Sequence, residues 1–229
     1  MPLKKSLGNM YNWVTHMHTH LGGECPHECS YCYVGRNKWG RAERYKGELR
    51  LMEWELKEDY GNGKIIFIEH MNDMFAKKVR KEWIEKIFVH CNRYPNQYVF
   101  QTKNPERAYE FYKYFPPQSL IGTTIETNRN NISKFSQAPA PVWRYEGIER
   151  FAKNGFDTFV TIEPIMDFDV DELVEWISDI RPKFVNIGAD SKKSNLPEPS
   201  SIKITQLIIG LNENGIVIKK KANLERILK

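Results

Sequence analysis

The chain has 229 residues, of which 41% are hydrophobic and 13% aromatic, so it suits one globular domain and is neither disordered nor fibrous. Its 34 basic and 29 acidic residues give a net charge of +5, which permits an anionic partner without requiring one. No apolar run reaches the roughly 18 residues of a membrane span, and residues 1–6 lead into no apolar stretch. We therefore expect a cytoplasmic protein without membrane contact, whose four cysteines are metal or redox groups rather than disulfides.

Seven short segments have the composition of β-strands. Most are continuous apolar runs, which is typical of parallel strands that are buried on both faces. In chain order they are residues 13–20, 65–68, 98–102, 120–125, 158–162, 184–187 and 216–218.

Helical patterns lie between these segments. Two apolar faces recur at helical spacing: Val79, Trp83, Ile84, Ile87 and Phe88, and then Leu173, Val174, Trp176, Ile177 and Ile180. Asn104 ahead of Pro105 predicts the start of another helix, because asparagine caps helices and proline is tolerated at the first helical position. A charged helix is predicted for residues 41–57.

This alternation of strands and helices predicts an α/β fold with a mostly parallel sheet. A full eight-unit barrel needs about 250 residues, so the chain is a little short for one. We expect a partial (β/α)6-type TIM barrel that occupies residues 1–229 as a single domain. In such folds the chemistry lies at the carboxyl ends of the strands, and the residues that follow each strand are therefore site candidates.

Three cysteines follow the first predicted strand: Cys25, Cys29 and Cys32. Thiolates are the usual ligands of iron–sulfur clusters, and three of them leave one iron of a [4Fe–4S] cluster open for catalysis. The alternative is a zinc ion bound by these thiols and His27, although structural zinc usually draws on a second, separate ligand pair that is missing here. Cys91 lies on a predicted helix over residues 78–92 and is expected to be an inert buried thiol.

The spacing C-x3-C-x2-C, with the aromatic Tyr31 directly before the third cysteine, resembles the signature of the radical S-adenosylmethionine superfamily. The resemblance implies a [4Fe–4S] cluster whose open iron chelates S-adenosylmethionine. It also implies an external one-electron donor of the flavodoxin or ferredoxin type. Reductive cleavage of the cofactor then yields a 5′-deoxyadenosyl radical, which abstracts hydrogen from a substrate.

Polar residues at the next two strand ends suit the amino-acid part of that cofactor. Asn72 and Asp73 follow the second strand and offer oxygen acceptors for its ammonium group, in place of the Gly-Gly-Glu motif of many relatives. Their alternative role is to cap the next helix. Lys103 follows the third strand and could pair with the carboxylate.

Two further strand ends complete the predicted site. Thr124 and Glu126 follow the fourth strand and could accept hydrogen bonds from the ribose hydroxyls. Glu163 follows the fifth strand and is expected to face the mouth of the site as a catalytic group. Each of these side chains could instead be a solvated loop residue.

Over residues 11–220 the pattern is similar to the spore photoproduct lyase group and to a related phage and prokaryotic branch. The shared elements are Tyr31-Cys32-Tyr33, the Asn72-Asp73 pair, Thr102-Lys103 and Glu163-Pro164. The likeness implies that Lys103 holds the cofactor carboxylate, that Tyr31 packs near the adenine and that Tyr33 lines the site as a catalytic residue. The lyases have a cysteine hydrogen donor where this chain has Met71, whose thioether has no transferable hydrogen, so photoproduct repair itself is not expected.

Two other groups attract attention. His16, His18 and His20 alternate along the first strand, where they could bind a second metal, make hydrogen bonds inside the barrel or be structural. Lys219, Lys220 and Lys221 are expected to follow the last strand, either as a solvated run or as phosphate contacts.

The sequence therefore predicts a radical S-adenosylmethionine enzyme of unspecified reaction. Because no long C-terminal segment is present to enclose a substrate, we expect an open site that suits a nucleic acid or a nucleotide. The rival hypothesis is a non-catalytic zinc or nucleic-acid-binding module.

Overall fold

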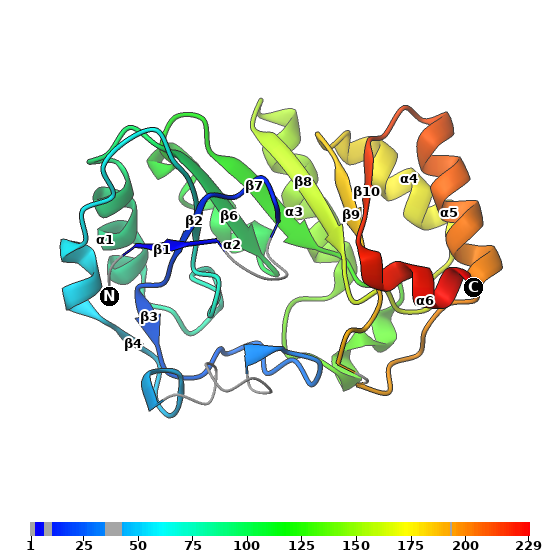
Figure 1. The fold of residues 1–229 in the computed structure, drawn as a ribbon, viewed down its shortest axis with the longest axis horizontal. Coiled ribbons are helices and arrows are strands. Elements are labelled where there is room, and N and C mark those ends of the chain that lie inside the picture. Colours follow the sequence, from blue (N-terminus) through cyan, green and yellow to red (C-terminus); the bar gives the residue numbers. More distant parts are fainter. Residues whose placement is uncertain (1–2, 7–10, 35–42, 193) are drawn as a thin grey trace.

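The computed structural model describes residues 3–6, 11–34, 43–192 and 194–229. Its main feature is an eight-stranded sheet in the order β1-β2-β5-β6-β7-β8-β9-β10 (Figure 1). The strands are β1 (Lys4–Lys5), β2 (His16–His18), β5 (Ile65–Ile68), β6 (Gln97–Thr102), β7 (Leu120–Thr124), β8 (Asp157–Ile162), β9 (Val185–Ile187) and β10 (Ile218–Lys220). From β2 to β10 all neighbours pair in parallel, and β1 is antiparallel to β2.

A strand is present at each of the seven predicted segments, and consecutive parallel strands are neighbours in the sheet. Every crossover therefore advances the sheet by one position, as in a (β/α) barrel. Among the described residues, β10 pairs with β9 alone, so β1 and β10 are the two edges of the sheet. The prediction of a partial barrel with a mostly parallel sheet is confirmed.

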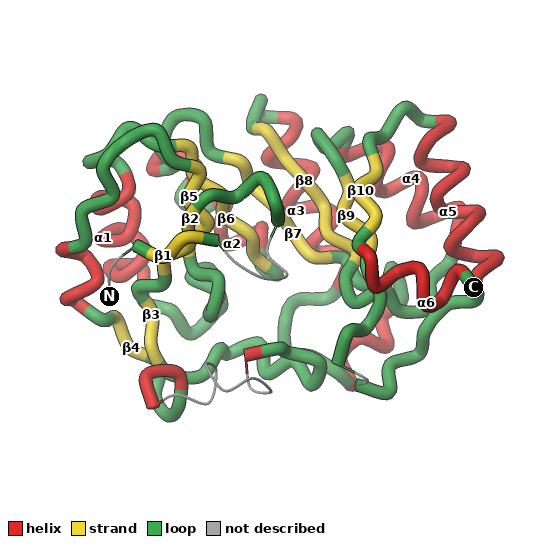
Figure 2. Tube along the Cα trace, in the orientation of Figure 1, coloured by secondary structure: helices red, strands yellow, loops and turns green. Residues whose placement is uncertain are grey.

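Helices cover the convex side of the sheet (Figure 2). They are α1 (Lys81–Cys91), α2 (Pro105–Tyr109), α3 (Pro141–Lys153), α4 (Val170–Ile180), α5 (Ser201–Glu213) and α6 (Glu225–Leu228). Asn104 caps α2 as predicted, because its side chain accepts a hydrogen bond from the backbone N–H of Arg107. No described helix combines the length and the apolar character that a bilayer crossing requires.

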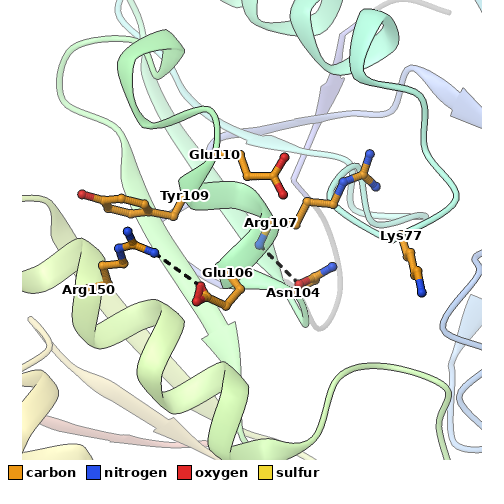
Figure 3. Close-up of a pocket in the computed structure, with 7 residues that line it drawn as sticks. All are labelled: Lys77, Asn104, Glu106, Arg107, Tyr109, Glu110 and Arg150. Atoms are coloured by element: carbon orange, nitrogen blue, oxygen red, sulfur yellow. Dashed lines mark hydrogen bonds and ion pairs between the residues drawn. The ribbon is translucent and has the colours of Figure 1, made fainter.

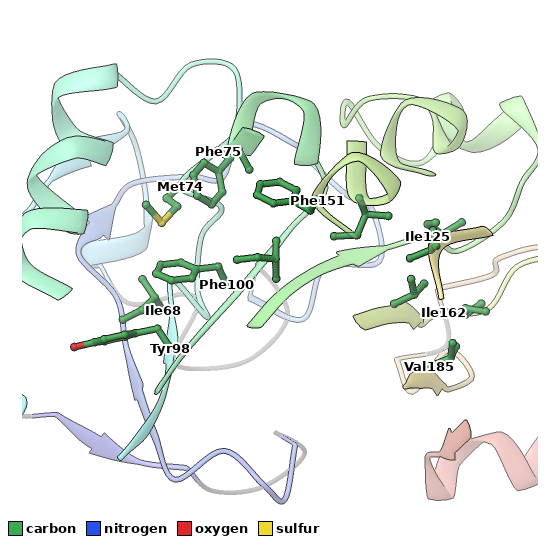
Figure 4. Close-up of a cluster of buried hydrophobic side chains, with 14 of the residues drawn as sticks. Ile68, Met74, Phe75, Tyr98, Phe100, Ile125, Phe151, Ile162 and Val185 are labelled. Carbon is green, nitrogen blue, oxygen red and sulfur yellow. The ribbon is translucent and has the colours of Figure 1, made fainter. Parts of the chain in front are cut away.

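Strand alternation divides the apolar side chains between the two faces of the sheet. The outward residues pack under the helices in the main core, which includes Ile68, Phe100, Ile125 and Val185 (Figure 4). The inward residues form a second cluster of Val14, Phe67, Val99, Leu120, Phe159 and Phe184. These residues lie just before a strand or among its first three residues, so they fill the interior toward the amino ends of the strands and leave the carboxyl ends for a site.

Residues 41–57 differ from the predicted helix. The described part contains 3₁₀ turns at Glu43–Tyr45 and Glu53–Lys57, and β4 (Arg50–Leu51) pairs with β3 (Leu21–Gly22). The reason is tertiary: β3 leads into the cysteine segment, and its backbone groups need a partner strand. Residues 41 and 42 lie outside the described residues.

The last strand also differs, since it runs two residues beyond the predicted end. Ile218 pairs with Val185 and the register continues to Lys220, so Lys219 and Lys220 lie within the strand rather than after it. Alternation then turns Lys219 inward, where its Nζ lies 3.4 Å from the centre of the Phe184 ring.

His18 lies on the outer side of β2, and His20 follows that strand. His18 Nε2 is 3.3 Å from Glu55 Oε2, and His20 Nε2 is 2.9 Å from Nδ1 of His90 on α1. Glu55 and His90 belong to elements outside the barrel interior, which favours the structural alternative for His18 and His20 over hydrogen bonding inside the barrel. His16 is half-buried, and its Nδ1 lies 2.9 Å from Thr15 Oγ1.

Burial of His18 makes a prediction about acid stability. Desolvation, reinforced by His20 and His90, lowers the pKa of His18 from 6.5 to about 2. The unfolded chain therefore binds a proton below pH 6.5 that the folded chain binds only near pH 2, so stability is lost progressively as the pH falls. We expect His18→Gln to reduce this loss by up to about 1.4 kcal/mol per pH unit. Urea denaturation at several pH values measures it, and identical slopes for the two proteins would contradict the assignment.

Candidate active site

The cysteine segment crosses the carboxyl ends of the strands and is fixed by its backbone. Gly23 has a φ of 83°, and a Cβ there would lie 2.2 Å from the carbonyl oxygen of Glu48, so only glycine fits. Farther along, Ser30 N–H donates to the Phe135 carbonyl at 2.8 Å, and Gln137 N–H donates to the His27 carbonyl at 2.7 Å. The loop is therefore held at both sides by distant parts of the chain.

The three thiols of this loop are in no disulfide among the described residues and are half-buried. Burial raises the pKa of Cys25, and the nearby charges of Asp73, Cys29 and Cys32 raise it further. Cys29 Sγ is 3.1 Å from Ser136 Oγ. Cys91 is fully buried in the main core on α1, where the sequence predicted an inert thiol.

Asp73 connects the cysteine loop to the ends of two strands. Its carboxylate lies 2.8 Å from His27 Nε2 and accepts hydrogen bonds from the Thr102 hydroxyl and from the backbone N–H groups of Lys103 and Phe75. Burial alone would raise the pKa of Asp73, but the His27 contact and these hydrogen bonds outweigh it and lower that pKa. The carboxylate is thus kept ionised beside the cysteines.

Asn72 extends the same connection. Its Oδ1 accepts from the backbone N–H of Asp73 at 2.9 Å, and its Nδ2 donates to the carbonyl of Gly23 at 3.2 Å. The two predicted ammonium acceptors therefore lie directly against the cysteine loop, with their side chains already hydrogen-bonded within the chain.

Glu126 gathers the second group of predicted residues. This carboxylate is fully buried just after β7 and accepts a hydrogen bond from the Tyr31 hydroxyl at 2.5 Å. Lys103 Nζ pairs with the same oxygen and also lies 3.3 Å from the Tyr31 hydroxyl. The structure thus brings Tyr31, Lys103 and Glu126 into direct contact. Thr124 is the last residue of β7, two residues before Glu126, and its hydroxyl accepts a hydrogen bond from Gln101 Nε2 at 2.9 Å.

Sequence reasoning missed the fourth member of this cluster. Arg144 of α3 is fully buried, and its Nη1 donates to Glu126 Oε2 at 2.6 Å and to the Thr124 carbonyl at 3.1 Å. No strand-end signal marks Arg144, which sits in an ordinary helical pattern that starts with Pro141. One carboxylate against two cations leaves the cluster with a net charge of +1.

The charges of this cluster fix its ionisation. Burial by itself would raise the pKa of Glu126, but the Arg144 and Lys103 charges and the hydrogen bonds from Lys103 and Tyr31 lower it to about 2. Glu126 is therefore an acceptor throughout the physiological pH range.

Glu163 occupies the next strand end. Its carboxylate pairs with Lys221 Nζ at 2.6 Å and accepts from Asn223 Nδ2 at 3.2 Å. Gly188 makes room for it, because a Cβ there would lie 2.8 Å from the Glu163 carboxyl group. The lysine tract is therefore split: Lys221 serves Glu163, whereas Lys219 packs on aromatic rings.

Tyr33 lies against the loop that follows β5. Its hydroxyl donates to the backbone carbonyl of His70 and is 4.0 Å from Met71 Sδ. The ring is 41% exposed, so it is accessible from outside the barrel end. Tyr33, the predicted catalytic tyrosine, is thus a neighbour of Met71, the residue for which the sequence analysis noted a cysteine in the lyases.

Comparisons with known proteins agree with this fold. A family model described as a protein of unknown function (DUF5131) matches residues 24–177, and no curated protein matches the sequence. A spore photoproduct lyase complexed with dinucleoside spore photoproduct is similar in structure, with a TM-score of 0.65 at 10% identity over 94% of this chain and 79% of that one. Streptococcus suis SuiB bound to S-adenosylmethionine aligns with a TM-score of 0.58 at 8% identity, over 90% of this chain and 50% of SuiB. At these identities the likeness establishes the fold.

The Glu126 cluster makes a prediction about stability. Arg144→Met would leave a buried carboxylate with one of its two cations missing, so we expect a loss of about 3–5 kcal/mol in the free energy of unfolding. Arg150→Met is the matched control on the same helix, since Arg150 is exposed and lies 3.7 Å from Glu106, and it should cost less than about 1 kcal/mol. Equal costs for the two variants in urea denaturation would refute the assigned role of Arg144.

Proposed function

This chain belongs to DUF5131, a family of unknown function, and we propose that it is a radical S-adenosylmethionine enzyme. The observation that carries the proposal is the loop of Cys25, Cys29 and Cys32. It lies at the carboxyl end of a partial barrel, beside a buried cluster with an excess positive charge. The fold shared with spore photoproduct lyase and SuiB supports it.

The cysteine loop suits a [4Fe–4S] cluster better than a single metal ion. Among the residues that the structure describes, no three His, Cys, Asp or Glu side chains converge on one ion position. Thiolates of a [4Fe–4S] cluster bind different irons and need no such convergence. His27, the fourth ligand of the zinc alternative, is engaged with Asp73 at 2.8 Å. Cys25, Cys29 and Cys32 would hold the cluster, which with bound S-adenosylmethionine supplies a 5′-deoxyadenosyl radical for hydrogen abstraction.

The residues around the loop suit the amino-acid part of S-adenosylmethionine. We propose that Lys103 pairs with the carboxylate, because the net charge of +1 in its cluster is balanced by one anionic group. Asn72 and Asp73 lie beside the cysteine loop and offer acceptors for the ammonium group.

The nucleoside part would lie over the ends of β6 and β7. Tyr31 presents its ring beside the adenine, and Thr124 and Glu126 offer acceptors to the ribose hydroxyls. Because Glu126 also holds Tyr31 and Lys103, it acts chiefly by orienting those two side chains.

Tyr33 and Glu163 are proposed to face the substrate. Tyr33 is the exposed aromatic residue next to the cysteines, and Glu163 is kept in place by Lys221 and Asn223. We propose a nucleic acid or a nucleotide as substrate, since the lyase neighbour binds a dinucleoside; SuiB, which binds a precursor peptide, marks the competing class. An external flavodoxin- or ferredoxin-type donor in the cytoplasm would supply the electron.

Reconstitution tests the cluster and the cleavage together. Anaerobically reconstituted protein should bind about four irons and four sulfides per chain. With dithionite it should convert S-adenosylmethionine to 5′-deoxyadenosine and methionine. Alanine at Cys25, Cys29 or Cys32 should abolish both properties, whereas Cys91→Ala, in the main core, should retain them. A colourless protein with one tightly bound zinc ion would identify the non-catalytic alternative.

Lys103 provides a separate test of cofactor binding. Loss of a charge-assisted contact costs on the order of 1.5–3 kcal/mol, so Lys103→Ala should weaken S-adenosylmethionine binding by about tenfold to a hundredfold. Iron content should not change, because lysine is not a cluster ligand. Equilibrium dialysis measures the affinity, with Lys113→Ala as an exposed lysine control, and an unchanged Kd would exclude the carboxylate contact.

A further inference from the structure

A dense group of cations lies on the loop that follows β5. Lys77, Lys78, Arg80 and Lys81 are exposed around the buried Val79. Arg107 of α2 donates to the carbonyls of Ala76 and Val79 and so holds this loop against α2. Together with Arg150 of α3, these residues form what we name the basic rim: Lys77, Lys78, Arg80, Lys81, Arg107 and Arg150.

The basic rim borders a hollow of about 530 Å³, which runs from Arg150 and Tyr109 on one side to Lys77 on the other (Figure 3). Its lining also includes Glu106 and Glu110. These two carboxylates are paired, Glu106 with Arg150 at 3.7 Å and Glu110 with Lys81 at 3.0 Å. Lys77, Arg107 and Arg150 line the hollow against these two carboxylates, so its lining has a net charge of +1. Lys78, Arg80 and Lys81 add exposed cations beside it.

Aromatic rings accompany this charge. The Arg150 guanidinium lies 4.3 Å from the centre of the Tyr109 ring, and the Tyr109 and Tyr112 rings stack at 5.1 Å with an angle of 10°. Tyr112 is 38% exposed, and Lys113 Nζ lies 5.6 Å from its ring centre. Cations combined with accessible stacked rings are what single-stranded nucleic acids bind, through their phosphates and bases respectively.

The hollow adjoins the candidate active site. Asn104, which lines it, directly follows Lys103, and Asn104 Nδ2 donates to the Phe75 carbonyl on the Asp73 loop at 3.0 Å. A strand that lies on the basic rim would therefore run beside the mouth of the barrel.

The lysine tract at the other edge of the sheet does not offer such a surface. Lys219 is folded onto the rings of Phe184 and Trp13, and Lys221 is paired with Glu163. The basic rim is therefore better suited to the phosphate contacts that the sequence suggested for this lysine tract.

We propose that the basic rim and the Tyr109–Tyr112 stack form a binding site for single-stranded nucleic acid. This binding site is separate from the catalytic centre and delivers a substrate strand to it. This inference rests on the proposed function in that the substrate is taken to be a nucleic acid. The phosphates lie on Lys77, Lys78 and Arg150, and a base extends the stack at Tyr112.

The test is a fluorescence titration of the reconstituted full chain with labelled single-stranded DNA and RNA oligonucleotides at several salt concentrations. Lys77→Ala/Lys78→Ala should weaken binding and reduce the slope of log affinity against log salt by about 1.4, because each contact to a single-stranded phosphate contributes about 0.7. Lys183→Ala/Lys220→Ala removes the same charge elsewhere and should leave the slope nearly unchanged. Tyr112→Ala should weaken binding by about fivefold to a hundredfold with little change in slope, and Tyr112→Phe should restore the affinity.

Several outcomes would overturn the proposal. The first is that oligonucleotides do not bind even at low salt. The second is that the two double-lysine variants weaken oligonucleotide binding equally. The third is that Lys77→Ala/Lys78→Ala loses affinity for an acidic peptide probe such as poly-glutamate but not for oligonucleotides. Cleavage of S-adenosylmethionine by dithionite-reduced protein without substrate is measured in parallel and should not differ among these variants. If cleavage is normal but oligonucleotides do not bind, the binding site is refuted and the enzyme proposal stands. If oligonucleotides bind but neither the wild-type protein nor any variant cleaves S-adenosylmethionine, the enzyme proposal fails instead.

Discussion

The site is organised by a single buried carboxylate, that of Glu126. It joins the cysteine loop through Tyr31, the end of β6 through Lys103 and helix α3 through Arg144. A buried carboxylate is tolerated only when it is paired and hydrogen-bonded, so its three partners must come together whenever the chain folds. The position of the cysteine loop is in this way coupled to the packing of a helix on the outside of the barrel.

Asp73 has the same role on the other side of the loop. It contacts His27, between the first two cysteines, and it accepts hydrogen bonds from Thr102 and from the backbone of Lys103. Lys103 is thus fixed by its backbone to Asp73 and by its side chain to Glu126. Two carboxylates, one after β5 and one after β7, thus hold the cysteine loop and the lysine that follows β6, the strand between them.

The two ends of the half-open barrel are chemically distinct, because apolar residues occupy one and charged residues the other. Inward apolar residues such as Phe159 and Phe184 fill the lower interior, while charged residues follow the strands at the opposite end. Gly122 allows this filling, because a Cβ there would collide with the Phe159 ring, and Gly188 leaves room for the Glu163 carboxyl group at the other end. The basic rim continues the polar end outward over α2, so that charge and aromatic rings extend from the site onto the surface.

The sequence by itself determined what depends on neighbours along the chain. The continuous apolar runs located all seven parallel strands, and the cap at Asn104 located α2, because burial on both faces and helix capping leave local marks. The positions of Cys25, Cys29 and Cys32, and of polar residues after each strand, are likewise local.

Tertiary structure alone decided which of these residues meet. It placed Arg144 from α3 under Glu126, turned His18 and His20 away from the interior, and divided Lys219 from Lys221. It also replaced the helix predicted within residues 41–57 by a short ribbon. The physical reason is that pairing of buried charges and strand register are settled between segments distant in sequence, and local composition carries no record of the partner.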